Sequence, residues 1–367
     1  MSLAPKDLRK YLDIVSRIRV DHEGYVSIRD EVIEAYDVIG ATATPVYMLI
    51  TGEPRTGKSS VVRDVLETYH PRQTDERTIR SVVYAVAPAK ASVKGLLESL
   101  LRGLGDPLWS RGTISSMTER LHTLLDEVEC KLVILDEFQH LCDRNKGDLL
   151  ADWLKVLLES SKFGLIAVGL PSSASVVSGH RQLKQRFDEP LCMPTFDWTD
   201  TASAGQFRAV LQQFQKQLHP FVLPNLASRE MGLRIFLATA GRIGLVAKLL
   251  DRAVRTAIRS QRLEIRLEDL AKAYERAIWG ASSFPISGGP FLASLADLEG
   301  QGVREVVFAN AAAEAVADQS SVVELHRASS SRKPANNSTS KGKSRAPAAQ
   351  KAKKSSRRAS DELRGVL

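Results

Sequence analysis

The stretch Gly52-Glu-Pro-Arg-Thr-Gly-Lys-Ser59 decides the fold of this 367-residue chain. It fits the pattern G-x4-G-K-[ST] without a departure, and it closely follows the apolar run 46–50. The two glycines let backbone N–H groups form a concave nest for phosphate oxygens, and a helix that begins near Lys58 adds its positive dipole end. The stretch therefore predicts a phosphate-binding loop between a buried strand and a helix.

The groups of this loop have expected roles in binding a nucleoside triphosphate. Lys58 supplies a mobile charge for the β- and γ-phosphates, and Ser59 supplies a hydroxyl ligand for Mg²⁺. ATP and Mg²⁺ are therefore the expected cofactors. The expected nucleotide-binding residues of the loop and the first helical turn are Gly52, Glu53, Pro54, Arg55, Thr56, Gly57, Lys58, Ser59 and Ser60.

A second motif, Leu132-Val-Ile-Leu-Asp136-Glu137, brings two carboxylates to the end of an apolar run. In parallel sheets, ligands bind at the carboxyl ends of the strands. Asp136 is therefore expected to bind nucleotide-associated Mg²⁺, and Glu137 is expected to polarise the attacking water. Because acidic pairs also occur at ordinary helix N-caps, this interpretation depends on the phosphate loop upstream.

Short apolar runs alternate with helical patterns over the first half of the chain. The helical patterns cover 59–69, 92–104, 114–128 and 147–161. The apolar runs cover 46–50, 81–87, 131–135, 164–168 and 191–196, of which the last is the weakest. The alternation predicts the α/β class, as a P-loop NTPase with a parallel five-stranded sheet and helices on both faces.

The remaining segments differ in character from this α/β pattern. Helical spacing without strand runs, at 202–218, 226–239, 243–260 and 266–279, predicts a small all-helical lid. One more helix is expected at 303–318, after a loop rich in Gly, Pro and Ser. The expected division is an N-terminal helical segment at 1–45, the nucleotide-binding domain at 46–199, the lid at 200–280, a linker or partner-docking segment at 281–326 and a basic disordered tail at 327–367.

The net charge of +8 comes from the C-terminal tail. The tail from Arg327 holds 12 of the 51 Lys and Arg residues and 2 of the 43 Asp and Glu residues, so residues 1–326 carry a formal charge of −2. The charge balance therefore gives no sign of a basic DNA-binding face on the body of the protein. The tail itself could neutralise nucleic-acid phosphates without reading sequence, or act as a solubilising linker.

Three arginines outside the two motifs are candidates for sensing or completing the nucleotide site. Arg186, between the fourth and fifth expected strands, is the candidate for a finger that reaches a neighbouring subunit, and Arg181 is its substitute. Arg242, at the start of a lid helix, is the candidate nucleotide sensor. After the fourth strand, where a polar side chain is expected near the γ-phosphate, Leu170 cannot serve and Ser172 is a substitute.

Cysteine usage and hydropathy restrict the cellular location. The three cysteines, Cys130, Cys142 and Cys192, have no spacing typical of a disulfide framework or a zinc site. No apolar run approaches the roughly 20 residues that cross a bilayer, and the N-terminus lacks the apolar core of a signal peptide. A cytoplasmic protein without a membrane partner is expected.

Several further segments resemble one branch of these ATPases. They are Ile134-Leu-Asp-Glu-Phe-Gln-His140, Val168-Gly-Leu-Pro171 and Gln182-Leu-Lys-Gln-Arg-Phe187. With the phosphate loop, they resemble the bacterial transposon AAA+ regulators called TniB or TnsC, over roughly residues 15–280. The target-selection ATPase of bacteriophage Mu is a more distant relative.

This resemblance implies an AAA+ fold of the ASCE type, with ATP bound between subunits that form rings or helical filaments on duplex DNA. It implies that the protein helps to choose the insertion target and activates a partner DDE transposase. Some relatives also receive a TniQ-type targeting protein, and a subset serve CRISPR-guided transposition. By the same analogy, Lys58, Ser59, Asp136 and Glu137 carry the nucleotide chemistry, and Arg186 acts in trans.

The resemblance also points to DNA contacts in the loop after the second strand, where Lys90 and Lys94 are the basic residues. Two positions depart from the family pattern. The position after the fourth strand is not clearly polar, and Gly241-Arg-Ile-Gly244 replaces the usual Gly-x-x-Arg of the lid. Slow or partner-stimulated hydrolysis is therefore expected.

Two other functions remain open at the level of the sequence. One is a helicase loader or replication initiator, although no winged-helix pattern follows residue 280. The other is a switch in which ATP sets the conformation without being hydrolysed. The behaviour of a Glu137→Gln variant on DNA separates the switch from the hydrolytic regulator.

Overall fold

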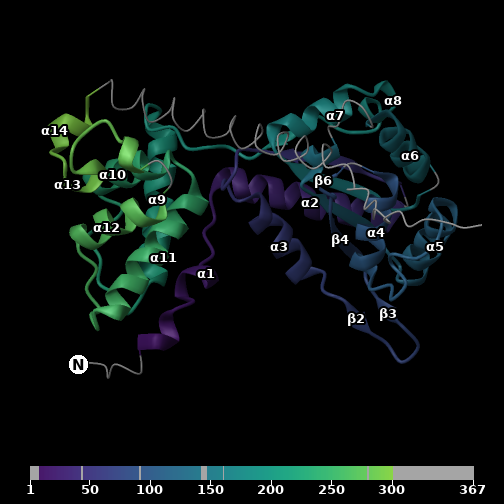
Figure 1. Cartoon of the computed structure of the whole chain (residues 1–367), viewed down its shortest axis with the longest axis horizontal. Coiled ribbons are helices and arrows are strands. Elements are labelled where there is room, and N and C mark those ends of the chain that lie inside the picture. Colours follow the sequence, from purple (N-terminus) through teal and green to yellow (C-terminus); the bar gives the residue numbers. More distant parts are fainter. Residues whose placement is uncertain are drawn as a thin grey trace, which may run out of the picture. The chain divides into compact units, whose positions relative to one another are not determined.

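The computed structural model describes residues 8–42, 44–90, 92–141, 147–159, 161–278 and 281–300 (Figure 1). Cys142, the helix expected at 303–318 and the basic tail at 327–367 lie outside these residues. No helix of the described part is long and apolar enough to cross a membrane.

A parallel sheet forms the centre of the N-terminal half of the chain. Its order is β4-β5-β6-β1-β7, and each neighbouring pair is parallel. The strands are β1 (Tyr47–Thr51), β4 (Val82–Val86), β5 (Leu132–Asp136), β6 (Gly164–Gly169) and β7 (Leu191–Cys192). All five expected strands are present, and the predicted fold class is confirmed.

The sheet differs from expectation at one edge and beside it. The run 191–196 gives a strand of two residues, because Pro194 has no N–H with which to extend the ladder. An antiparallel hairpin, β2 (Arg72–Gln73) with β3 (Thr78–Ile79), also forms in a polar stretch that no apolar run marks.

Helices cover both faces of the sheet, as its continuous apolar strands require. One face packs Met48, Ile50 and Ile134 against α2 (Glu23–Thr42) and α3 (Lys58–Thr68). The other face packs Leu49 and Leu135 against α4, α5 and α6 (Figure 1). These three helices are α4 (Val93–Leu104), α5 (Ile114–Glu127) and α6 (Gly147–Glu159).

Short helical turns follow two of the central strands. Directly after β5 comes η2 (Phe138–Leu141). After β6, the chain passes through η3 (Pro171–Ser173), α7 (Ala174–Ser178) and α8 (Arg181–Lys184) before it reaches β7. Both connections begin at the carboxyl edge of the sheet, where ligands bind in open parallel sheets.

The C-terminal helices share a separate apolar core that is lined by Phe207, Phe236 and Leu249. They are α9 (Thr201–Gln217), α10 (Arg229–Thr239), α11 (Ile243–Arg259) and α12 (Leu267–Ala277), followed by η4 (Ala281–Ser283), α13 (Gly289–Leu292) and α14 (Leu295–Leu298). Phe291 and Leu298 are fully buried in this core. The described part of the segment that we expected to be a linker therefore packs on the helices.

The N-terminal segment divides its contacts between these two cores. Leu8 of η1 (Leu8–Tyr11) and Val15 of α1 (Ile14–Arg17) belong to the core of the C-terminal helices. Tyr25, Ile28 and Val32 of α2 belong instead to the core beneath the sheet. Residues 18–22, between α1 and α2, therefore connect the two cores.

Candidate functional site

The phosphate loop joins β1 to α3, and its two glycines are needed for different reasons. Gly57, the N-cap of α3, has φ 115°, a conformation that side chains rarely adopt. Gly52 has an ordinary φ, but a Cβ there would stand 2.9 Å from Met193 Cβ, next to β7. The first glycine therefore lets two segments approach, and the second lets the chain turn into the helix.

The N-terminus of α3 offers donors that the helix itself does not use. Ser60 N and Val61 N both bond to Gly57 O, at 2.8 and 3.3 Å. The N–H groups of Lys58 and Ser59 come before these bonds and, with the positive end of the helix dipole, suit an anion. These donors lie where the sequence predicts the phosphate nest, and phosphate binding there stays a prediction.

Lys58 connects the loop to the acidic pair. Its Nζ donates to Gly52 O at 2.7 Å and to Glu53 O at 2.8 Å. Burial lowers the pKa of Lys58 below its usual range, while the nearby carboxylates of Asp136, Glu137 and Glu53 oppose that shift. The loop and the acidic pair, which are far apart in sequence, are therefore brought into one site.

The carboxylate of Asp136 accepts two hydrogen bonds from neighbouring residues. Tyr84 on the neighbouring strand β4 donates its hydroxyl to Oδ2 at 3.1 Å, and Glu137 N donates to Oδ1 at 2.8 Å. Burial, together with the charge of Asp136, raises the pKa of Tyr84 to about 12. Tyr84 therefore remains a hydrogen-bond donor to Asp136 at physiological pH. The sequence analysis did not predict Tyr84 as a site residue.

Glu137 has a backbone conformation that is unusual for its residue type. Its φ is 58°, and its side chain is exposed at the end of β5. Gln139 Nε2 donates to Glu137 Oε2, and Gln139 Oε1 in turn accepts from Leu170 N at 3.0 Å. Gln139 was also not predicted as a site residue.

The residues present fit a nucleotide with Mg²⁺. Ser59 and Asp136 offer the hard oxygen ligands that this ion prefers, and the loop offers a concave set of donors. Among the described residues no group of three or more His, Cys, Asp or Glu could hold a metal alone, so phosphates and water would complete the shell. When bound, Mg²⁺ would neutralise charge on the phosphates.

The arginine predicted to act in trans has a partner in its own chain. Arg186 Nη2 lies 3.1 Å from Glu159 Oε1, at the end of α6. Arg181, at the start of α8, is exposed. Neither side chain contacts the loop or the acidic pair through an ion pair within the described residues.

The start of α11 contacts the phosphate loop. Gly244 N donates to Arg55 O at 2.8 Å, and a Cβ on Gly244 would stand 2.9 Å from the same oxygen. Arg242, the predicted sensor, is the buried N-cap residue of α11. The motif Gly241-Arg-Ile-Gly244 thus meets the loop through the backbone of its last glycine.

The remaining predicted residues lie on either side of the carboxyl edge. Ser172 is partly buried in η3, but it is the next residue, Ser173, that is fully buried beside Gly169. Lys90 and Lys94 are exposed around the start of α4, which follows the edge strand β4. The two lysines are thus accessible, as a surface that contacts DNA requires.

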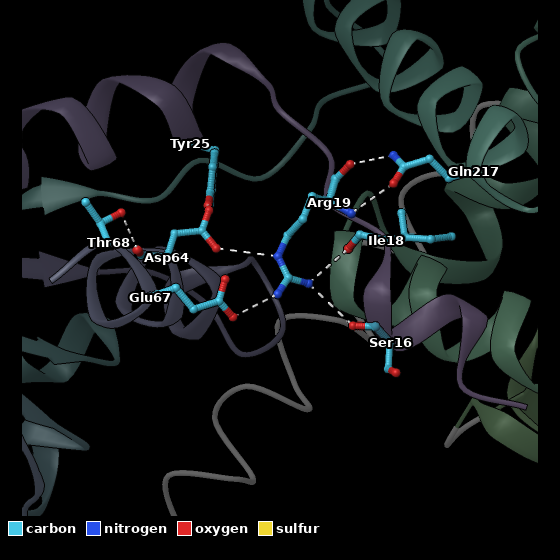
Figure 2. Close-up of polar contacts among 8 residues, drawn as sticks. All are labelled: Ser16, Ile18, Arg19, Tyr25, Asp64, Glu67, Thr68 and Gln217. Carbon is cyan, nitrogen blue, oxygen red and sulfur yellow. Dashed lines mark hydrogen bonds and ion pairs between the residues drawn. The ribbon is translucent and has the colours of Figure 1, made fainter. Parts of the chain in front are cut away.

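Residues 18–22 connect α3 to α9 through polar contacts (Figure 2). The guanidinium of Arg19 lies 3.2 Å from Glu67 Oε1 and 3.5 Å from Asp64 Oδ1 on α3. The amide of Gln217 on α9 donates to Arg19 O at 2.6 Å and accepts from Arg19 N at 3.2 Å. The helix that begins with Lys58 is therefore tied to the C-terminal helices.

Comparison with protein families identifies the sheet-forming part of the chain. The family described as bacterial TniB protein matches residues 19–197. This segment belongs to the TniB family. The match spans the phosphate loop, the acidic pair and the segment with Arg186, and no match was found among curated proteins. The TniB-family segment is the nucleotide-binding part of an AAA+ P-loop ATPase.

Solved structures with low sequence identity share this fold. The Aeropyrum pernix ORC1 protein, solved in complex with DNA, is 18% identical with a TM-score of 0.56, over 72% of this chain and 68% of that one. Cdc6p from Pyrobaculum aerophilum is 16% identical with a TM-score of 0.55, over 75% and 74%. A Drosophila ORC chain, bound to DNA, is 12% identical with a TM-score of 0.53, over 90% and 87%.

Proposed function

We propose that this protein is an ATP-dependent regulator of DNA transposition. It would form a homo-oligomer, as a ring or helical filament, on duplex target DNA, select the insertion site and activate a DDE transposase. The observation that carries the proposal is that the phosphate loop and the acidic pair meet in one place, inside a segment that matches the TniB family over residues 19–197. A TniQ-type protein is a further proposed partner, and the bacterial cytoplasm the proposed location.

Within this function, each part of the nucleotide site has a proposed role. Lys58 and the loop hold the phosphates, Ser59 and Asp136 hold Mg²⁺, and Glu137 accepts a proton from the attacking water. The low local polarity around Lys58 strengthens its attraction to phosphate. Arg242 would report nucleotide to the lid through α11, whose Gly244 N bonds to Arg55 O.

Oligomer formation gives the segment after β6 its proposed role. Arg186 would reach the γ-phosphate of a neighbouring subunit, which requires that it leave Glu159. That ion pair costs little to break, because both side chains are partly exposed, at 30% and 46%. Arg181 is the exposed substitute on the same segment.

Duplex DNA is the proposed substrate of the assembly. Lys90 and Lys94, both exposed near the start of α4, are the proposed phosphate contacts of each subunit. Repeating two weak contacts along a filament would give strong binding without base reading. The tail from residue 327 would add a further charge-dependent contact.

The first test is DNA binding with ATP, with ADP and without nucleotide, imaged by negative-stain electron microscopy. Wild type, Lys58→Ala and a chain lacking 327–367 would be compared at two salt concentrations. Rings or filaments that need ATP, and that Lys58→Ala does not form, would support the proposal. Binding that ignores nucleotide and disappears with the tail would mean that the tail alone binds DNA, and the assembly proposal would be wrong.

A helicase loader or replication initiator is the second candidate, and the fold shared with ORC1 and Cdc6p is compatible with it. Both proteins are less than 20% identical to this chain, so the similarity supports a shared fold but does not indicate a shared binding partner. Copurification of a replicative helicase, without binding of the transposase, would favour this candidate. A Glu137→Gln variant with unchanged lifetime on DNA would instead favour a switch that does not hydrolyse ATP.

A further inference from the structure

The side-chain amide of Gln139 connects two strand ends of the nucleotide site. Gln139 lies in η2, two residues after Glu137, and its Nε2 donates to Glu137 Oε2. Its Oε1 accepts from Leu170 N at 3.0 Å, and Leu170 directly follows β6. One side chain therefore joins the proposed water-activating carboxylate to the backbone of a different segment.

The two partners determine the orientation of this amide. The backbone N–H of Leu170 can only donate, so the oxygen of Gln139 faces it. The ionised carboxylate of Glu137 can only accept, so the NH₂ group of Gln139 faces that side. Rotating the amide by half a turn would set donor against donor and acceptor against acceptor, and both hydrogen bonds would be lost together.

The surroundings leave the Gln139 amide little room to move. A Cβ on Gly169 would stand 2.5 Å from Gln139 Oε1, 2.3 Å from Ser173 Oγ and 3.2 Å from Phe138 N. Ser173 is fully buried, and its Oγ has no hydrogen-bond partner among the described residues. A glycine at 169 is thus what lets the amide reach Leu170 N.

Glu137, in contrast, has little packing to hold its carboxylate. Its side chain is exposed, and its left-handed backbone places it on a turn between β5 and η2. An exposed glutamate samples many rotamers, and fixing one of them costs conformational entropy. The hydrogen bond from Gln139 restricts these rotamers before any water is activated.

We propose that Gln139 is a positioning residue for ATP hydrolysis, which holds the Glu137 carboxylate in its productive orientation and makes that orientation depend on Leu170. The inference rests on the role of Glu137 in the proposed function. Leu170 begins the segment that continues through η3, α7 and α8 to Arg181 and Arg186. A shift of that segment in an assembly would therefore reach Glu137 through a single side chain.

Gln139→Met tests the hydrogen bonds while it keeps the length of the side chain. We expect kcat to fall about tenfold, the effect of losing one hydrogen bond to a charged group, with the KM for ATP within twofold of wild type. Binding of a fluorescent ATP analogue and thermal unfolding would confirm an intact loop and fold. Gln212→Met, an exposed glutamine of α9, is the matched control and should leave kcat unchanged.

Gln139→Glu separates the two hydrogen bonds of the amide. It keeps an acceptor for Leu170 N but replaces the NH₂ donor to Glu137 with a second carboxylate, which cannot donate to it when ionised. We expect kcat to fall at least as far as in Gln139→Met, with the KM for ATP within about twofold of wild type. Wild-type kcat in this variant would overturn the proposal.

The double variant Glu137→Gln with Gln139→Met decides whether Gln139 acts through Glu137. We expect its residual hydrolysis to equal that of Glu137→Gln alone, because the carboxylate that Gln139 holds is already gone. A further tenfold loss of hydrolysis in the double variant would overturn the positioning role of Gln139 but leave the role of Glu137 intact. Wild-type hydrolysis by Glu137→Gln would overturn the assignment of the base in the proposed function, and with it the role of Gln139.

Discussion

The phosphate loop and the acidic pair lie at the same edge of the sheet but are stabilised differently. The loop is held mainly by its own short stretch of backbone, in which Thr56 Oγ1 and Lys58 Nζ donate to carbonyls of Gly52 and Glu53. A contact also comes from the lid helices, through Gly244 N, which donates to Arg55 O. The acidic pair is held by side chains and backbone from other segments, through Tyr84 on β4 and Gln139 with Leu170 after β6. Under the proposed function, nucleotide binding should therefore depend mainly on local geometry, and turnover on contacts between strands.

The largest expected effect separates turnover from binding. Glu137→Gln should lower the ATP hydrolysis rate by about 100- to 10,000-fold, because it removes a general base, while nucleotide affinity stays within about threefold. Steady-state hydrolysis and titration with a fluorescent ATP analogue measure the two quantities. Glu119→Gln, on the exposed part of α5, is the control. A parallel fall in affinity would show that the two regions are not separable.

The second effect should fall on binding. Lys58→Ala removes the partly buried ammonium group that is expected to bind the phosphates. It should weaken ATP binding by about 10- to 100-fold, as expected for a lost charged hydrogen bond. Titration with the same analogue measures this change. Arg63→Ala, an exposed basic residue of the same helix, should have little effect. Equal losses in the two variants would mean that general charge, and not the loop, attracts the nucleotide.

A third, smaller effect tests whether loop geometry alone supports binding. Gly57 and Gly205 both have open space where a Cβ would stand, but Gly57 has φ 115°. Gly57→Ala should therefore strain the loop by about 1–2 kcal/mol and weaken ATP binding by about tenfold. Gly205→Ala, inside α9, should leave binding unchanged and leave stability the same or raise it by about 0.5–1 kcal/mol. Thermal unfolding and nucleotide titration distinguish the two, and a neutral Gly57→Ala would contradict the argument.

The smallest effect concerns the strand-to-strand support of Asp136. Tyr84→Phe removes one hydrogen bond and should raise the Mg²⁺ concentration for half-maximal hydrolysis by about three- to fivefold. Because the pKa of Tyr84 is about 12, the effect should be constant from pH 6 to pH 9. Tyr69→Phe, whose ring stacks on Tyr36 away from Asp136, is the control. A strong pH dependence in that range would exclude this explanation.

The difference between the two regions also explains what the sequence could predict. The loop is contiguous, so its pattern alone indicated Gly52–Ser59 and the strand and helix on either side. Tyr84, Gln139 and Gly169 come from three segments, and their meeting depends on the register of β4, β5 and β6. Once that register is known, Tyr84 is two residues before Val86, which pairs with Asp136, and so it could be found.

Other differences follow from features that carry little local signal. The hairpin of β2 and β3 has no apolar alternation, and it forms by pairing across the turn between Gln73 and Thr78. The buried Phe291 lies in a stretch rich in Gly, Pro and Ser, a composition that predicts a loop. The apolar surface that this one aromatic side chain buries is enough to pack the stretch on the core. The roles of Arg186, Arg242, Lys90 and Lys94 remain predictions.

The contact between residues 18–22 and α9 has a consequence for how this part of the chain tolerates change. Gln213 and Gln217, one helical turn apart, bond to the backbone N–H and C=O of Asp21 and Arg19, which are two residues apart in the segment 18–22. Such pairing ignores the identity of the side chains but requires the spacing of alternate residues. The contact with α9 therefore depends on the number of residues in this segment. Many substitutions at Asp21 should be tolerated, whereas inserting or deleting one residue would shift the backbone groups away from the amides of Gln213 and Gln217.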